Sequence, residues 1–180
     1  MSDALPNNFF ELFEIPVSYD VDLNQLRLRY RDLQKAVHPD KYASASSQER
    51  RISMQQTSLI NQALHTLKHP VERAIYLLQL RGLDFGAGNE NTMDAAFLME
   101  QMEMREKMES IRRHDDPLAE LDAMSADIKS GMKALADEFK RAYADGQLDN
   151  AREAVRKMQF LYKASQEVDE QAAAIEDEMI

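Results

Sequence analysis

Residues 22–40 read DLNQLRLRYRDLQKAVHPD, and this stretch determines how the N-terminal part of the chain folds. Its apolar side chains recur at steps of three and four residues, which is the pattern of one buried stripe on a helix. That stripe consists of Leu23, Leu26, Tyr30, Leu33 and Val37. Asp22, with Gln25 three residues later, resembles a capping box and predicts the start of the helix. The basic residues that lie off the stripe, and are expected to face water, are Arg27, Arg31 and Lys35.

The stretch ends in the tripeptide His38-Pro39-Asp40. A proline disfavours helical geometry at the residue before it, so the helix is predicted to end near Val37 with the tripeptide at its tip. Two interpretations are open for such a tripeptide. Taken in isolation it is more often an ordinary helix stop than a functional signature, so the flanking sequence has to decide.

Matching motifs lie on both sides of the tripeptide, in order. They are Leu26-x-x-x-Tyr30-Arg31-x-Leu33 before it and, after it, Asp40-Lys41-Tyr42, Ile60-Asn61-Gln62-Ala63-x-x-x-Leu67 and Pro70-x-x-Arg73-Ala74-x-Tyr76. The series resembles a J-domain from about Asn8 to Arg81, which favours the functional interpretation. The fold expected for this part is an antiparallel helix pair with two short helices packed against it.

The composition excludes several classes of protein. The 180 residues leave room for one or two domains with a core of their own. The absence of cysteine excludes disulfides, a cysteine nucleophile and thiolate ligands for zinc or an iron–sulfur cluster. The N-terminus has neither a basic region nor a long apolar run. We therefore expect no signal peptide, no transmembrane segment and no membrane partner, and a cytoplasmic location.

Charge is unevenly distributed along the chain. Residues 1–81 hold 10 Lys+Arg and 9 Asp+Glu, whereas residues 82–180 hold 12 and 23, so the net charges of +1 and −11 sum to −10. An acidic region repels phosphate backbones, and nucleic acid is therefore not expected as a partner.

Capping and breaking residues predict the remaining helices of the first part. A short helix carrying Phe9, Phe10, Leu12 and Phe13 should begin at Asn7 or Asn8. Ser46 and Glu49 form a capping box for a helix that runs to about Leu67. Its inward residues are predicted to be Ile52, Leu59, Ile60, Ala63 and Leu67. Pro70 suits the first position of a fourth helix, which Gly82 should end.

A domain boundary is predicted where three of the five glycines fall, at Gly82, Gly86 and Gly88. The expected organisation is a J-domain over residues 1–81, a linker over 82–93 and a second domain over 94–180. In this second domain, apolar residues recur without a break over many turns, which predicts a three-helix bundle. One helix should begin at Asp116-Pro117 and another at Asp149 or Asn150, after a stop at Gly146. The fold class predicted for the whole chain is all-α.

The first helix of that bundle is apolar on two sides. Phe97, Met104, Met108 and Ile111 supply the face that the bundle needs. A second stripe points elsewhere and consists of Leu98, Met99 and Met102, flanked by Glu103 and Glu106, with Phe160 similarly displaced on the third helix. This second stripe must be buried against something. It either packs on the rest of the chain or forms a docking patch for a hydrophobic and basic partner, and the pattern leaves both open.

A closer resemblance covers nearly the whole chain. A J-domain without a Gly/Phe-rich segment or cysteine-rich module, followed by an acidic three-helix bundle, resembles the HscB family. The runs that carry this resemblance are Ala96-Phe-Leu-Met-Glu-Gln-Met-Glu-Met-Arg-Glu106 and Arg156-Lys-Met-Gln-Phe-Leu161. The resemblance implies a co-chaperone of iron–sulfur cluster assembly that is not an enzyme. Its J-domain would stimulate the ATPase of a specialised DnaK-class chaperone, HscA, and its bundle would deliver the cluster scaffold, IscU.

Site residues follow from the resemblance position by position. Those implied to bind the chaperone are His38, Pro39, Asp40, Arg27, Arg31, Lys35 and Lys41, and those implied to bind the scaffold are Leu98, Met99, Met102, Glu103, Glu106 and Phe160. The chain departs from generic J-domains at Asp32, where a basic residue is common. This departure favours a dedicated chaperone over a general one.

Other classes of function remain as alternatives. A metal-dependent hydrolase could use His65 and His69, but no third ligand or HExxH pattern accompanies them, so surface histidines are the better interpretation. An all-helical adaptor would have the tripeptide by chance, and a J-protein could also serve another client. We expect no metal, no cofactor of the chain's own, and a monomer.

Overall fold

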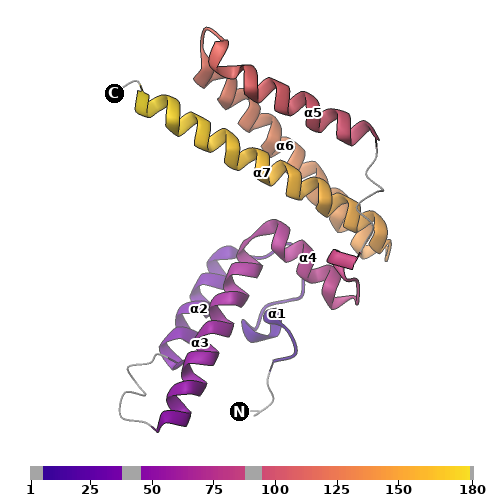
Figure 1. Ribbon diagram of the computed structural model, residues 1–180. Helices are drawn as coiled ribbons and strands as arrows, with labels where there is room; N and C mark the ends of the chain where they lie inside the picture. Colours follow the sequence, from indigo (N-terminus) through magenta and orange to yellow (C-terminus); the bar gives the residue numbers. More distant parts are fainter. Residues whose placement is uncertain (1–5, 38–45, 88–94, 179–180) are drawn as a thin grey trace. The chain divides into compact units, whose positions relative to one another are not determined.

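Every described element of the chain is helical, which confirms the all-α prediction. The computed structural model describes residues 6–37, 46–87 and 95–178. Its helices are α1 (Phe9–Leu12), α2 (Leu23–Val37), α3 (Ser47–Lys68), α4 (Pro70–Leu80), α5 (Ala95–Ser110), α6 (Pro117–Ala144) and α7 (Leu148–Glu178), with 3₁₀ turns η2 (Phe85–Ala87) and η4 (Ile111–Arg113) (Figure 1).

The chain divides into two compact units, Met1–Leu77 and Leu78–Ile180. The division falls inside α4, four residues before the boundary that the glycines at 82–88 predict. In the first unit α2 and α3 lie side by side, and α1 packs on α3 (Figure 1). In the second, α6 and α7 pack along each other and α5 lies against them (Figure 1).

Capping residues begin α2 and α3 as predicted, whereas α7 begins at Leu148, before the predicted start at Asp149 or Asn150. Asp22 accepts hydrogen bonds from the backbone N–H groups of Asn24 and Gln25, at 2.8 and 3.2 Å. At α3, Ser46 and Glu49 form a reciprocal capping box. The hydrogen bonds from the Ser46 hydroxyl and backbone N–H lower the pKa of Glu49. These bonds satisfy N–H groups that the first turn of a helix otherwise leaves without partners.

Two glycines end helices in the left-handed conformation. Gly82 has φ 81° and Gly146 has φ 74°. After each glycine the next backbone N–H reaches back to a carbonyl of the last turn, from Leu83 to Leu78 at 3.1 Å and from Gln147 to Ala142 at 2.9 Å. This is the Schellman pattern, in which a glycine accepts a positive φ without a Cβ penalty. The predicted stops at these two positions are confirmed.

Polar bonds between α2 and α3 fix the first unit near the end of α2. The Ser53 hydroxyl donates to the Val37 carbonyl at 2.7 Å. One turn earlier, Gln34 Nε2 donates to both Tyr30 Oη and Asn61 Oδ1, at 2.6 and 3.2 Å, and Tyr30 Oη donates to Asn61 Oδ1 at 3.0 Å. The last turns of α2 are therefore held by side chains of α3 before the chain enters residues 38–45.

Apolar burial in this unit differs in part from the prediction. Ile60, Ala63 and Leu67 are buried as expected, but Ile52 and Leu59 are 44% and 38% exposed. Ser53 is buried instead, because its hydroxyl serves the α2 carbonyl. Of the α2 stripe, Leu26 is fully buried while Leu23 is 38% exposed. The helix itself was predicted correctly, but the assignment of Ile52 and Leu59 to its inward face was wrong.

The bundle core includes Met108 and Ile111 from the face that the sequence assigned to the bundle. Its buried residues are Met108, Ile111, Leu121, Met124, Ile128, Ala164, Val168 and Ile175, with Met104, Leu118, Met132, Leu161 and Ala172 packed around them. Arg112 Nη1 donates to both carboxylate oxygens of Glu178, at 3.0 and 3.3 Å, which ties η4 to the end of α7. This exposed pair adds little energy, so the apolar core is what stabilises the bundle.

Replacing Ile128 by Ala should lower the free energy of unfolding of the bundle by about 2–5 kcal/mol, because the deleted atoms leave a cavity in a closely packed core. Ile128 is 2% exposed. Urea unfolding followed by circular dichroism measures the change. The control is Lys129→Ala, an exposed neighbour on the same helix, which should change the value by less than about 0.5 kcal/mol. Equal effects of the two would contradict the burial of Ile128 in the bundle core.

Candidate functional site

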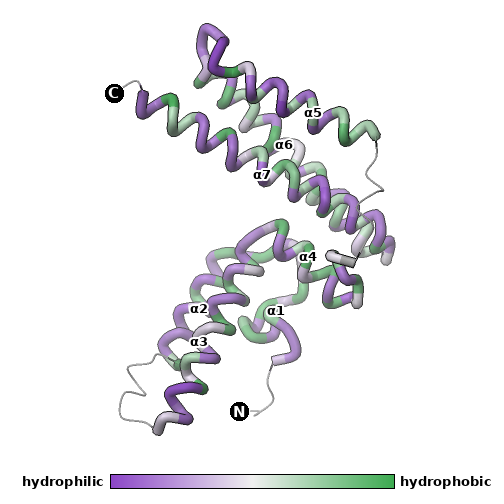
Figure 2. The backbone as a smooth tube through the Cα atoms, viewed as in Figure 1, coloured by the Kyte–Doolittle hydropathy of each residue, from purple (hydrophilic) through white to green (hydrophobic). Residues whose placement is uncertain are grey.

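One face of α5 presents large apolar side chains to solvent. Leu98 is 44% exposed, and Met99 and Met102 are each 63% exposed. On the opposite side of the same helix Phe97 and Met108 are 6% exposed and belong to the bundle interior. The first turn of α5 is accordingly hydrophobic all round (Figure 2). Within the bundle Leu98, Met99 and Met102 are only partly covered by their neighbours, so much of their apolar surface remains available to a partner.

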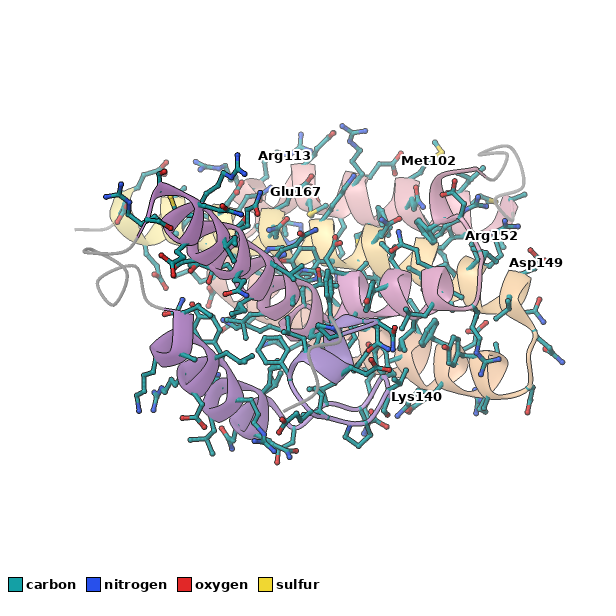
Figure 3. The ribbon with its side chains drawn as sticks, turned by 90° about the horizontal axis from the view of Figure 1, so that it is seen from below. Met102, Arg113, Lys140, Asp149, Arg152 and Glu167 are labelled. Carbon is teal, nitrogen blue, oxygen red and sulfur yellow. The ribbon has the colours of Figure 1, made fainter. Side chains whose placement is uncertain are left out.

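A groove of about 430 Å³ lies between α5 and α7. Its lining residues are Leu98, Gln101, Met102, Arg105, Met108, Phe160, Lys163, Ala164 and Glu167. The structure therefore brings together three of the residues singled out from the sequence, Leu98, Met102 and Phe160, which come from two different helices. Figure 3 labels Met102 on α5 and Glu167 on α7. Pockets of this kind, with an apolar floor and a few polar groups, are typical of binding sites.

Phe160 is positioned by Phe97, a residue that the sequence assigned only to the bundle interior. The rings of Phe160 and Phe97 meet edge to face, with centroids 5.6 Å apart and planes at 88°. Lys157 Nζ lies 5.4 Å from the centroid of the Phe97 ring. Edge-to-face pairs and cations over rings are favourable contacts of aromatic side chains. Phe97 does not line the groove itself, but it fixes the orientation of the Phe160 ring that does.

Three other predicted residues lie beside the groove and do not line it. Met99, Glu103 and Glu106 are exposed on α5. They can touch a partner that extends beyond the groove, but they form none of its walls. The predicted carboxylate rim is consequently displaced from the apolar floor.

The sequence missed the polar groups that line the groove. Gln101 and Arg105 on α5 and Lys163 and Glu167 on α7 were not singled out. A signal for them exists, because positions 98, 101, 102 and 105 repeat at steps of three and four, as do 160, 163, 164 and 167. Each set shares one helix face with the apolar residues that were recognised.

The basic face of α2 is arranged as predicted. Arg27, Arg31 and Lys35 are exposed, and they follow one another at intervals of four residues, which places them on one side of the helix. In the described part of the chain none of them forms an ion pair, whereas Arg29 pairs with Glu14 at 2.9 Å. His38, Pro39, Asp40 and Lys41 lie outside the described residues.

The two histidines considered as metal ligands have a structural explanation. The His65 and His69 rings are stacked with centroids 6.3 Å apart. His69 Nδ1 accepts a hydrogen bond from the backbone N–H of Glu72 at 3.3 Å, which caps the start of α4. Partial burial lowers the pKa of His69, an effect that the Glu72 carboxylate opposes. Among residues 6–37, 46–87 and 95–178, no cluster of three or more His, Asp or Glu side chains is placed to hold a metal ion.

Comparisons with known proteins agree with this architecture. Residues 93–169 match the family described as HSCB C-terminal oligomerisation domain. The chain is 42% identical over 164 residues to a co-chaperone protein HscB homolog of Shewanella halifaxensis, covering 89% of this chain and 94% of that one. It is 35% identical over 173 residues to the homolog from Pseudoalteromonas atlantica, covering 94% and 99%.

Solved structures show the same relationship. The chaperone HscB from Vibrio cholerae superposes with a TM-score of 0.84 at 36% identity, covering 96% of this chain and 99% of that one. The human co-chaperone protein HscB superposes with a TM-score of 0.84 at 27% identity, covering 95% and 85%. The fold and the two-unit organisation define a J-domain co-chaperone. The chain belongs to the HscB family of co-chaperones, and the resemblance noted in the sequence is confirmed. In the described part of the chain, none of the helices has the length and apolarity needed to span a membrane.

Removing the exposed stripe should leave the bundle folded. The double variant Met99→Ala/Met102→Ala should change the free energy of unfolding by less than about 0.5 kcal/mol, because both side chains are 63% exposed. Phe97→Ala should instead cost about 3–5 kcal/mol, since its ring is buried and supports Phe160. Thermal unfolding followed by circular dichroism distinguishes them. A destabilised double variant would mean that the stripe serves stability instead of docking.

Proposed function

We propose that this protein stimulates the ATPase of an HscA-like, DnaK-class chaperone through its J-domain and delivers an IscU-like cluster scaffold through its C-terminal bundle. The observation that carries the proposal is the exposed apolar surface of α5 beside the groove, in a chain that also has a J-domain. Such a chain is suited to hold a client at one place and activate a chaperone from another.

The chaperone-binding part of the proposal uses α2 and the residues after it. Arg27, Arg31 and Lys35 supply a cationic face that attracts an acidic chaperone surface and orients the J-domain on it. His38-Pro39-Asp40 follows directly on the end of α2, which Ser53 fixes by its bond to Val37. The carboxylate of Asp40 offers a strong acceptor to cationic groups of the chaperone, and Lys41, the next residue in the sequence, adds a donor.

The scaffold-binding part uses the apolar surface of the bundle. Leu98, Met102 and Phe160 receive apolar side chains of the scaffold in and around the groove, and Met99 extends this surface. Methionine adapts its shape to a partner better than branched side chains do. Glu103 and Glu106 form an outer rim that contacts basic groups of the scaffold.

The chain performs no chemistry of its own in this proposal. It prefers the conformation in which the chaperone hydrolyses ATP, and each tenfold gain in rate needs only about 1.4 kcal/mol of such preference. Tethering scaffold and J-domain on one chain raises the concentration of the scaffold at the chaperone. The proposal assigns the J-domain to residues 1–81, the linker to 82–93 and the scaffold-binding domain to 94–180. It also takes the protein to be cytoplasmic and to act as a monomer.

The first test is the steady-state ATPase rate of the chaperone, measured with this protein, with and without scaffold. We expect stimulation that the scaffold increases further. His38→Gln should abolish stimulation, because the tripeptide contacts the chaperone, while its circular dichroism spectrum and scaffold binding stay unchanged. Stimulation that persists in this variant would refute the assigned role of the tripeptide. A complete lack of stimulation by the natural chain would leave an all-helical adaptor.

The second test addresses the client. The triple variant Leu98→Ala/Met99→Ala/Phe160→Ala should weaken scaffold binding by at least about a hundredfold, since central apolar anchors each contribute on the order of 1–2 kcal/mol or more. Calorimetric titration with purified scaffold measures the affinity. A matched control is Leu28→Ala/Met54→Ala, which removes exposed apolar side chains from the first unit, where they are 59% and 66% exposed. Unchanged binding by the triple variant would mean that the bundle serves another client.

A further inference from the structure

The groove is lined by two cationic side chains although the region around it is acidic. Residues 82–180 hold 12 Lys+Arg and 23 Asp+Glu. Of the groove-lining residues, Arg105 and Lys163 are basic and Glu167 alone is acidic. The two cations come from different helices, α5 and α7, and both are on the surface. The local charge of the groove is therefore opposite in sign to that of the domain that contains it.

Neither cation is neutralised within the described part of the chain. Arg105 Nε lies 3.8 Å from Glu109, and the two side chains are 81% and 71% exposed, so this pair is weak. Lys163 forms no ion pair there, although Glu167 lies one helical turn further along α7. With Glu167 counted, the residues that line the groove carry a net charge of +1. Both cations are consequently available to an acidic group brought in by a partner.

The position of the cations gives them more effect than surface charges usually have. They stand beside an apolar floor made of Leu98, Met102, Met108, Phe160 and Ala164. A partner that fills this floor excludes water from the neighbourhood of the cations, and charge interactions strengthen as water is removed. The guanidinium of Arg105 can bind a carboxylate through two parallel hydrogen bonds, and the ammonium of Lys163 supplies a second positive charge.

We propose that Arg105 and Lys163 form a receptor for a carboxylate of the scaffold, so that the groove recognises an apolar side chain with an acidic residue beside it. This proposal rests on the proposed function of the bundle as the scaffold-binding domain. It adds one requirement, which is that the partner presents a carboxylate. Neither the apolar stripe nor Glu103 and Glu106 would select for that group. Glu103 and Glu106 select basic groups outside the groove, whereas Arg105 and Lys163 select an acidic group within it. Contacts of both signs, at fixed places around one apolar anchor, set the orientation of the partner as well as its affinity.

The experiment compares two double variants, each of which removes two positive charges from the bundle. Arg105→Gln/Lys163→Gln removes the groove cations, and Lys107→Gln/Arg113→Gln removes exposed cations of α5 and η4 that do not line the groove. Arg113 is labelled in Figure 3. Binding of purified IscU-like scaffold is measured by calorimetric titration. We expect about tenfold weaker binding for the groove variant, the size of one charge-assisted hydrogen bond, and less than about twofold for the control.

A charge exchange identifies the partner group. Each scaffold Asp or Glu that lies beside an exposed apolar residue is changed to Lys, and each such scaffold is titrated with Arg105→Glu/Lys163→Glu. One of these scaffolds should recover most of the affinity that the reversed groove has lost. Failure of every exchange to restore binding would overturn the proposal.

The outcomes separate this proposal from the proposed function. Tight binding by the natural chain, lost in Leu98→Ala/Met99→Ala/Phe160→Ala but unaffected by Arg105→Gln/Lys163→Gln, would refute only the carboxylate receptor. Tighter binding by the groove variant would show that the partner brings a cation there, and would refute it too. No binding by the natural chain would refute the scaffold assignment and the receptor with it.

Discussion

The lengthwise packing of α6 against α7 is the contact on which the bundle depends. These two helices are joined by the short turn at Gly146 and share a continuous apolar interface. Because α6 and α7 pack along their length, they bury most of their own apolar side chains against each other. One side of a third helix is then enough to complete the core. The remaining surface of α5 is free to carry other side chains. Because the core uses Phe97, Met108 and their neighbours, the exposed Leu98, Met99 and Met102 cost the bundle little stability.

The first unit is organised by a different kind of constraint. Its helix pair is fixed by polar side chains of α3 that reach α2, at Ser53 and Asn61, in addition to the apolar contacts beneath them. Hydrogen bonds have stricter geometry than apolar contacts, so they set the register of the two helices where they occur. The register is set most firmly over the last turns of α2, directly before the His38-Pro39-Asp40 tripeptide. Arg27, Arg31 and Lys35 are thereby held on a rigid helix with their charged ends in water.

Most of the architecture could be predicted from the sequence because it depends on local signals. The capping box at Ser46, the stops at Gly82 and Gly146 and the long apolar stripes of α6 and α7 each involve residues close together in the chain. The inward face of the start of α3 could not be predicted in this way. Burial of Ser53 in place of Ile52 depends on a carbonyl of α2 sixteen positions away, and hydropathy contains no information about that partner.

The site shows the same distinction. The apolar stripe of α5 was recognisable because its residues exceed what a bundle helix needs. The polar groups of the groove were not, since an exposed Arg105 or Lys163 looks like any solvated charge until two helices bring them to one opening. Phe97 was assigned to the core correctly, but its contact with Phe160 depends on the distance between α5 and α7. Helical periodicity identified the faces of α5 and α7 that line the groove. It gave no reason to single out Arg105 and Lys163 among the charged residues of the two helices.

The size of the groove has a consequence for how long a complex can last. About 430 Å³ accommodates only a few side chains, so the apolar anchor of any partner bound there is small. Among related complexes, differences in affinity appear mainly in the dissociation rate, and a small anchor shortens the residence time. A brief residence agrees with the proposed function, in which the protein releases the scaffold once the chaperone has bound it. A wider groove would admit a larger apolar anchor and would lengthen the lifetime of such a complex.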